Sequence, residues 1–313
     1  MRKDFVNEVA RQNKIERADL VEKDMILHQI LIDLSKNEFF APNFAFKGGT
    51  CLTKCYLGYY RFSEDIDFTW MHQEVLEGKS QTRIRNVLSE IIDKTGEIFE
   101  EISKKRSLDF RCEKHNNHYV ELGGSNKMCT FKLWYHSELL NRESFMKVQM
   151  NFVERLYFPI QKKELRTLTS KESEELIFLF PEFQEYLQTI TFYTYDIKEI
   201  LSEKVRSILT REGYKARDFL DVYLICKEYK IFLEEMLEPI VGKTSFVLQT
   251  YEKYRKSFAK KAILLDEPFL WGEEKGLLLK DIDDKDFSDF LEKFGLFLKK
   301  VVDQVTALNS LEA

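Results

Sequence analysis

Two carboxylates, Asp65 and Asp67 in the stretch RFSEDIDF, are the residues of this chain most suited to chemistry. Polar and apolar residues alternate over 65–70, which predicts a strand, and residues i and i+2 of a strand project from the same face. Two like charges so close repel unless a cation lies between them. Because both ligands are oxygens, we expect Mg²⁺, with Mn²⁺ as the alternative, shared with a phosphate-bearing substrate.

A glycine pair, Gly48 and Gly49, lies upstream between a predicted strand at 44–46 and a predicted helix at 49–57. Glycine lets a ligand approach the backbone closely, and the free amides at the start of a helix favour phosphate. Thr50 or Ser63 can add a hydroxyl. A lone DxD is usually a salt-bridged pair and a lone Gly-Gly a turn, but both together at this spacing favour a nucleoside triphosphate site.

The elements around this stretch form the order strand, glycine turn, helix, strand, after a helix at 20–36 whose apolar residues have helical spacing. A long charged helix is expected at 82–103. Gly123 and Gly124 indicate a hairpin turn. The strand-like runs are 107–112, 118–122, 128–135 and 145–153.

From about 197 onward the pattern is helical, and Pro181 in LFLFPEFQEY lies near the expected boundary. The sequence therefore predicts an α+β fold. We expect a mixed α/β domain with a mixed sheet over residues 1–190 and a helical bundle over 191–313.

Composition narrows the class of protein. Hydrophobic residues make up 44% of the 313, which excludes global disorder. No stretch has the roughly 18 apolar residues that a membrane span needs, and no signal peptide is recognisable. The five cysteines are odd in number and lack a CxxC, so a reducing, cytoplasmic location without membrane contact is expected.

The net charge of −5 is unevenly distributed. Residues 264–313 hold 12 Asp and Glu against 6 Lys and Arg, so the rest of the chain is close to neutral. The overall acidity therefore does not exclude a nucleic-acid partner, although the C-terminal segment is a poor surface for phosphate.

The glycine and carboxylate motifs carry a family resemblance. KGGT, a leucine, a lysine and then RFSEDIDF together resemble the AbiEii/AbiGii nucleotidyltransferase toxins, a branch of the DNA polymerase beta-like nucleotidyltransferase superfamily. Two further stretches are similar to this family: VEKD at 21–24 and ILSEKVRSILTREGYKARDFLDVYLI at 200–225. The resemblance implies a nucleotidyltransferase-like domain.

The resemblance also implies roles for single residues. Asp65 and Asp67 would bind magnesium and act in catalysis, and Lys204 would neutralise phosphate charge. Asp218 and Asp221 would orient that lysine or take part in catalysis. The nucleotide-binding set comprises Lys47, Gly48, Gly49, Thr50, Arg61 and Ser63.

Without the resemblance, Lys204 has an ordinary interpretation as a solvated lysine on an amphipathic helix. Asp218 and Asp221 lie three residues apart, and pairing with Arg211, Lys215 or Arg217 is the alternative for them.

One departure from the superfamily concerns its third carboxylate, the general base toward the attacking hydroxyl. The matching strand reads KVQMNFVER, with the amides Gln149 and Asn151 where an acid is expected. An amide cannot accept a proton in that role. Glu154, a helical aspartate, or a hydroxyl acidified by the metal alone are the alternatives.

Three functions are compatible with these features. The first is an enzyme that transfers a nucleoside monophosphate from a nucleoside triphosphate to a hydroxyl. The family implies a toxin of a toxin–antitoxin or phage-defence system, with RNA, a tRNA 3′ end in particular, as acceptor and a cognate antitoxin as partner. The alternative is a nucleotide-binding module without transfer activity that acts through a protein partner. A DxD glycosyltransferase is disfavoured by the glycine turn.

Four residues have side chains that can bind zinc: Cys112, His115, His118 and Cys129. Their spacing matches no strong zinc pattern. RCEKHNNHYV instead predicts a hairpin with an Asn-Asn turn.

Overall fold

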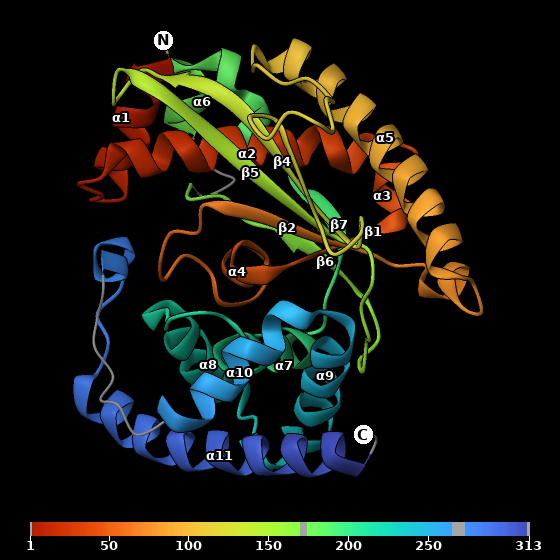
Figure 1. Cartoon of the computed structure of the whole chain (residues 1–313). Coiled ribbons are helices and arrows are strands. Elements are labelled where there is room, and N and C mark those ends of the chain that lie inside the picture. The colour runs from red at the N-terminus through yellow and green to blue at the C-terminus, as the bar shows by residue number, and fades with distance from the viewer. Residues whose placement is uncertain (1, 170–173, 265–272, 312–313) are drawn as a thin grey trace. The chain divides into compact units, whose positions relative to one another are not determined.

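The computed structural model describes residues 2–169, 174–264 and 273–311 (Figure 1). The chain divides into two compact units. The sheet unit comprises Met1–Glu154 and Ile160–Thr194, and the helical unit comprises Arg155–Pro159 and Tyr195–Ala313. The short segment 155–159 thus belongs to the helical unit, although the residues on both sides of it belong to the sheet unit.

The sheet unit contains a seven-stranded sheet in the order β3-β4-β5-β2-β1-β7-β6. Strand β2 pairs in parallel with β5, and β1 pairs in parallel with β7, whereas the other neighbours are antiparallel. The sheet is therefore mixed, as predicted. The strands are β1 Phe44–Lys47, β2 Asp65–Trp70, β3 Val120–Gly123, β4 Met128–Ser137, β5 Arg142–Asn151, β6 Gln161–Leu165 and β7 Ile190–Thr194.

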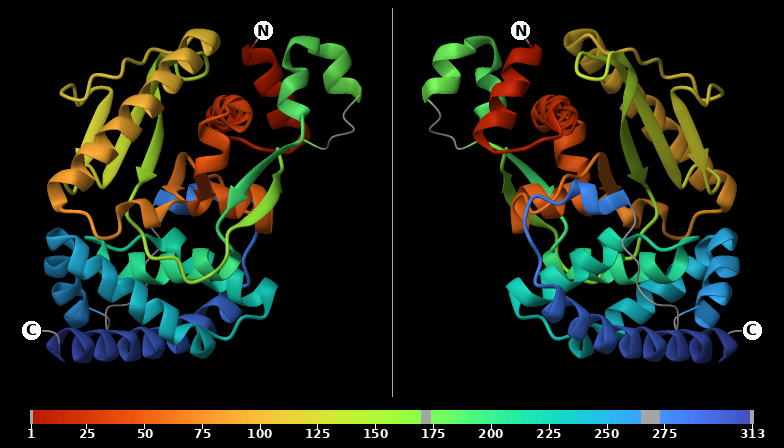
Figure 2. Two further views of the ribbon diagram at one scale, coloured as in Figure 1. Left: turned by 90° about the vertical axis from the view of Figure 1, so that its right-hand side faces the viewer. Right: turned by 90° about the vertical axis from the view of Figure 1, so that its left-hand side faces the viewer.

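Helices α2 (Ala18–Lys36) and α5 (Gln81–Arg106) pack on one face of this sheet, and Figure 2 shows both alongside the strands. Phe68 of β2 meets Phe40 edge to face at 4.8 Å, and Phe40 in turn meets Phe99 of α5. Because side chains alternate along a strand, Asp65 and Asp67 project from the opposite face. Also in this unit are α1 Arg2–Gln12, α3 Phe40–Asn43, α4 Gly48–Cys51 and α6 Glu174–Leu179.

The helical unit is a bundle, as predicted for the C-terminal part. Asp196 caps α7 by accepting a hydrogen bond from the Lys198 amide at 2.8 Å. The faces that pack together are apolar, with fully buried residues such as Ile200 and Leu220. The helices are α7 Ile197–Thr210, α8 Ala216–Tyr229, α9 Leu237–Thr250, α10 Glu252–Leu264 and α11 Asp284–Leu311.

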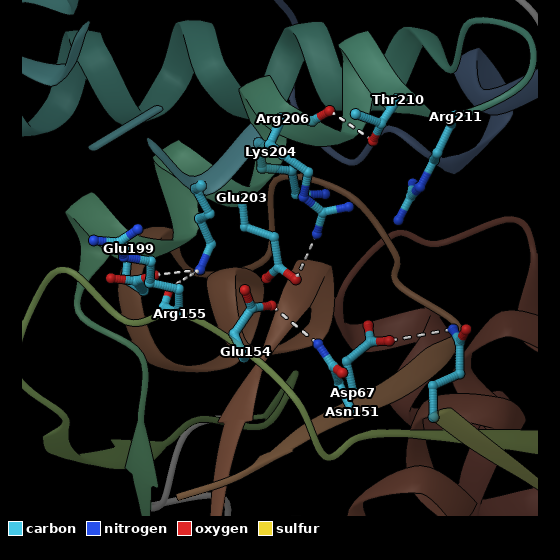
Figure 3. Close-up of polar contacts among 12 residues, drawn as sticks. Asp67, Asn151, Glu154, Arg155, Glu199, Glu203, Lys204, Arg206, Thr210 and Arg211 are labelled. Atoms are coloured by element: carbon cyan, nitrogen blue, oxygen red, sulfur yellow. Dashed lines mark hydrogen bonds and ion pairs between the residues drawn. The ribbon is translucent and has the colours of Figure 1, made fainter. Parts of the chain in front are cut away.

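A buried ion pair holds segment 155–159 within the helical unit (Figure 3). Glu199 accepts hydrogen bonds from the amides of Tyr157 and Phe158, both at 2.9 Å. Lys243 donates to Glu199 at 2.5 Å and to the Arg155 carbonyl at 2.9 Å. Both charged side chains are 0% exposed, so each charge needs the other to offset its loss of solvent.

Some sequence predictions of elements were wrong. Residues 107–112 form no strand beyond a single bridge between Asp109 and Trp134. The hairpin expected in RCEKHNNHYV is absent, because 112–119 runs through turns before β3 begins at Val120. Strands β6 and β7 were not predicted. None of the helices in the described residues combines the length and apolar character that a bilayer crossing requires.

Candidate active site

The two carboxylates of β2 lie between β1 and β5. Asp67 stands opposite Lys47 of β1 and opposite Gln149 of β5, whose amide donates to Asp67 Oδ1 at 3.2 Å. Asp65 stands opposite Lys147. Both carboxylates are half-buried on the face that α2 and α5 leave free, so the strand prediction for this motif is confirmed.

The glycine turn lies directly against these carboxylates. Gly48 has a φ of +76°, and a β carbon added there would overlap the carboxylate of Asp67. A β carbon on Gly49 would come within 2.7 Å of the Arg61 guanidinium and 3.0 Å of Ser63 Oγ. Both positions therefore require glycine, because side chains of the same site occupy the space where another residue would place its own.

Hydrogen bonds tie the turn to the start of β2. Thr50, 1% exposed, donates to the Asp65 carbonyl at 2.5 Å, and its oxygen lies 2.9 Å from Ser63 Oγ. Arg61 is also buried and donates to the Phe62 carbonyl at 2.8 Å. Lys47 is buried as well. The structure thus brings all the predicted nucleotide-binding residues around one turn, where Lys47 and Gly48 lie beside Asp67.

The helix that begins at the glycines is anchored by a buried charge. After α4, the chain continues as a π-helical turn, Leu52–Leu57, which contains Lys54. Lys54 is 0% exposed, and its ammonium lies 2.8 Å from the carboxylate of Asp24 in α2. Asp24 closes the VEKD motif, and Lys54 is the lysine of the glycine motif. The two motifs therefore form one ion pair.

Two tyrosines complete the environment of Asp24. Tyr59 and Tyr186 donate their hydroxyls to its carboxylate at 2.9 and 3.1 Å. Burial raises the pKa of both phenols well above the usual value, and the charge of Asp24 raises it further. Both hydroxyls therefore stay protonated and act as donors.

The two amides that replace the expected third acid each hold a carboxylate (Figure 3). Gln149 donates to Asp67, and Asn151 donates to Glu154 Oε2 at 3.0 Å. Glu154 is buried, and its backbone N–H donates to the side-chain oxygen of Gln73 at 2.9 Å. The strand therefore lacks an acid at these two positions, and both amides instead donate to acids nearby.

Lys204, Asp218 and Asp221 come together in the helical unit. The lysine ammonium lies 2.7 Å from both carboxylates, and Arg211 lies 3.1 Å from Asp218. Burial raises the pKa of Asp218, but Lys204 and then Arg211 lower it by more, so the pKa lies below the ordinary value. The lysine is thus positioned by both aspartates, and Arg211 also contacts one of them.

The donor set fits a hard cation. Asp65 and Asp67 offer carboxylate oxygens on one face beside a glycine turn, the ligand chemistry that Mg²⁺ shares with phosphate oxygens. Within residues 2–169, 174–264 and 273–311, no group of three or more His, Cys, Asp or Glu side chains is arranged to hold a metal ion. Cys112, His115, His118 and Cys129 therefore form no such group.

Comparison with known proteins identifies the family. The profile of the nucleotidyl transferase AbiEii toxins of type IV toxin–antitoxin systems matches residues 29–308. The chain belongs to the AbiEii nucleotidyltransferase toxin family. This match spans the glycine, carboxylate and helical motifs, whereas VEKD at 21–24 lies before its start, and this AbiEii chain is therefore a nucleotidyltransferase.

Other comparisons add little to that assignment. No curated protein matches this AbiEii chain. The crystal structure of JHP933 from Helicobacter pylori is 16% identical and covers 94% of this chain and 98% of its own, with a TM-score of 0.41. A second H. pylori structure, described as a candidate nucleotidyltransferase, is 17% identical and covers 94% of this chain and 97% of its own, with a TM-score of 0.39.

Proposed function

We propose that this toxin transfers a nucleoside monophosphate from a nucleoside triphosphate to a terminal hydroxyl of RNA, with a tRNA 3′ end as the preferred acceptor. The hydroxyl oxygen attacks the α-phosphorus, the bond from the α-phosphorus to the bridging oxygen breaks, and pyrophosphate leaves. The contact between Gly48 and Asp67 supports this proposal best. It joins a phosphate-binding turn to a metal-binding carboxylate.

In this proposal the amides of the glycine turn and the hydroxyls of Thr50 and Ser63 bind the triphosphate. Mg²⁺ held by Asp65 and Asp67 would stabilise the charge that develops on the phosphate oxygens. Lys204, which pairs with Asp218 and Asp221, is assigned by the family resemblance to neutralise phosphate charge. We assign Glu154, which Asn151 orients, as the base that accepts the proton of the attacking hydroxyl. The family description further supports a cognate antitoxin as the partner of this chain.

Labelled nucleotides test the reaction. The full chain is incubated with Mg²⁺, total RNA and each nucleoside triphosphate carrying the label at either the α- or the γ-phosphate. Label should reach RNA from the α-position only. Label from the γ-position would show phosphoryl transfer instead, and nucleotide binding without any transfer would favour the module that acts through a protein partner.

Asp65→Asn should reduce transfer by about a thousandfold or more, because the metal site supplies several kcal/mol of transition-state stabilisation. Glu64→Gln is the matched control. Glu64 precedes Asp65 in the chain, but its carboxylate pairs with Lys23 at 2.9 Å. Activity should therefore persist in this variant. Equal loss in both variants would contradict the assignment of Asp65.

A further inference from the structure

The face of the sheet that carries Asp65 and Asp67 continues over β5 and β4 in regular rows. Lys147 stands opposite Asp65 on one side and opposite Lys132 on the other. Two residues earlier on β5, Phe145 stands opposite Trp134. Since residues two apart on a strand are separated by about 7 Å, the aromatic row lies about 7 Å from the lysine row and next in line after it.

The aromatic row is extended by a histidine, and we call His118, Trp134 and Phe145 the aromatic platform. The His118 ring is stacked on Trp134 at 4.3 Å with an interplanar angle of 4°, and Trp134 meets Phe145 at 4.8 Å. The indole N–H donates to the His118 carbonyl at 2.9 Å, which fixes the pair. His118 is exposed, and the other two rings are half-buried.

This exposure separates the platform from the core aromatics. Phe40, Phe44 and Phe68 on the opposite face are all 0% exposed. A preformed stack that keeps contact with solvent offers π faces on which a nucleic-acid base can stack, and such stacking tolerates any base.

The lysine row adds a matching charge. Lys132 is already paired with Glu121 and donates to the Asn117 carbonyl at 3.0 Å. Lys147 makes no side-chain hydrogen bond or ion pair with any residue that the structure describes. Since Glu121 already neutralises Lys132, the ammonium of Lys147 is the charge in this row that can contact a phosphate of an anionic ligand.

We propose that the aromatic platform and Lys147 bind the single-stranded end of the RNA acceptor. Bases stack on the platform, Lys147 contacts a backbone phosphate, and the terminal hydroxyl continues along the sheet toward Asp65. A single strand is required because a duplex does not expose the faces of its bases. The inference rests on the proposed transfer to RNA, and it assigns a binding surface to that acceptor.

Binding of a fluorescein-labelled single-stranded RNA 12-mer to the full chain tests the platform in the absence of any nucleoside triphosphate. His118→Ala and Lys147→Gln should each weaken binding about tenfold, the effect expected for one base stack or one desolvated charge contact. Lys162→Gln removes an equivalent charge from β6, at the other edge of the same sheet, and should bind RNA as the unmodified chain does.

The dependence on salt separates the two roles. Lys147→Gln should reduce the slope of log K against log salt concentration by about 0.7, the value for one phosphate contact on a single strand. His118→Ala should leave the slope unchanged. In the transfer assay, both variants should raise the KM for RNA and leave the KM for the nucleoside triphosphate unaltered.

Three outcomes would overturn the platform: no RNA binding by the unmodified chain, equal affinity in all variants, or preference for a protein acceptor over RNA. Failure of the proposed reaction has a different signature. In that case RNA would bind, and the substitutions would weaken RNA binding, but no label would pass from the α-phosphate to RNA. The aromatic platform would then be supported, and the proposed transfer to RNA would be wrong.

Discussion

Removing the buried ammonium of Lys54 should destabilise the sheet unit and the nucleotide site together. Lys54→Met leaves the carboxylate of Asp24 buried, with the hydroxyls of Tyr59 and Tyr186 as its remaining partners among the described residues. Breaking a buried pair by removing one partner costs about 3–5 kcal/mol. Against a total stability of about 5–15 kcal/mol for a domain, this is a large loss.

A double-mutant cycle measures the pair itself. Asp24→Asn combined with Lys54→Met removes both charges, so the free energy of unfolding should recover, with a coupling near 3 kcal/mol, the upper end of observed values. Urea denaturation of the single and double variants gives this number. The same variants should bind the nucleoside triphosphate more weakly, because Lys54 anchors the helix that begins at Gly48.

The adjacent residue provides the control. Lys23 of the same helix pairs with Glu64 at 2.9 Å, but both side chains are partly exposed, so their coupling should stay below about 1 kcal/mol. If the cycle for Asp24 and Lys54 gives no more than the cycle for Lys23 and Glu64, burial does not strengthen this pair and the reasoning fails.

Two further predictions concern the turn and the pH dependence. Gly48→Ala should abolish nucleotide binding, because the added β carbon would overlap the Asp67 carboxylate. Gly58→Ala should cost only about 1–3 kcal/mol of backbone strain, because Gly58 has a φ of +73° and a ψ of −177° and an added β carbon would lie 3.8 Å from Arg166. Equal effects of the two substitutions in nucleotide-binding assays would contradict the role of the contact between Gly48 and Asp67. Burial and then Lys54 hold the pKa of His28 well below 6.5. The unfolded chain therefore binds the extra proton, and stability should fall by up to about 1.4 kcal/mol per unit as pH drops below about 6.5. Urea unfolding between pH 8 and 5 should show this slope, and His28→Gln should lack it.

The carboxylate motif and the glycine turn could be read from the sequence because both depend on neighbouring residues. The two-residue spacing of Asp65 and Asp67 fixes their common face in any strand. Likewise, a glycine pair between a strand and a helix indicates a close backbone approach wherever it occurs. These are local properties, and the structure confirms them.

The pairing of Asp24 with Lys54 could not be read in the same way. The residues are 30 positions apart, and only the packing of α2 against the rest of the sheet unit brings them together. The family resemblance contained a signal, since both residues lie in its motifs, but a motif does not say which of its members touch.

Strand β7 was missed for another reason. ITFYT is only five residues long and follows the Phe-rich stretch that holds Pro181. Its β-branched and aromatic residues and its alternating burial are nevertheless typical of a strand. Its neighbours in the sheet, β1 and β6, precede it in the chain, so its position in the sheet required the tertiary fold.

The assignment of segment 155–159 to the helical unit has a consequence for any attempt to divide the chain. Polypeptide passes between the two units three times, at 154–155, 159–160 and 194–195. A fragment that starts at Tyr195 would lack the amides and carbonyl that Glu199 and Lys243 bind, and it would leave that pair with unsatisfied polar atoms. A fragment that ends at Thr194 would keep the sheet, but its segment 155–159 would lack the contacts with Glu199 and Lys243. Neither unit is therefore one continuous piece of the chain, and a single cut cannot separate them without removing residues from one of the two.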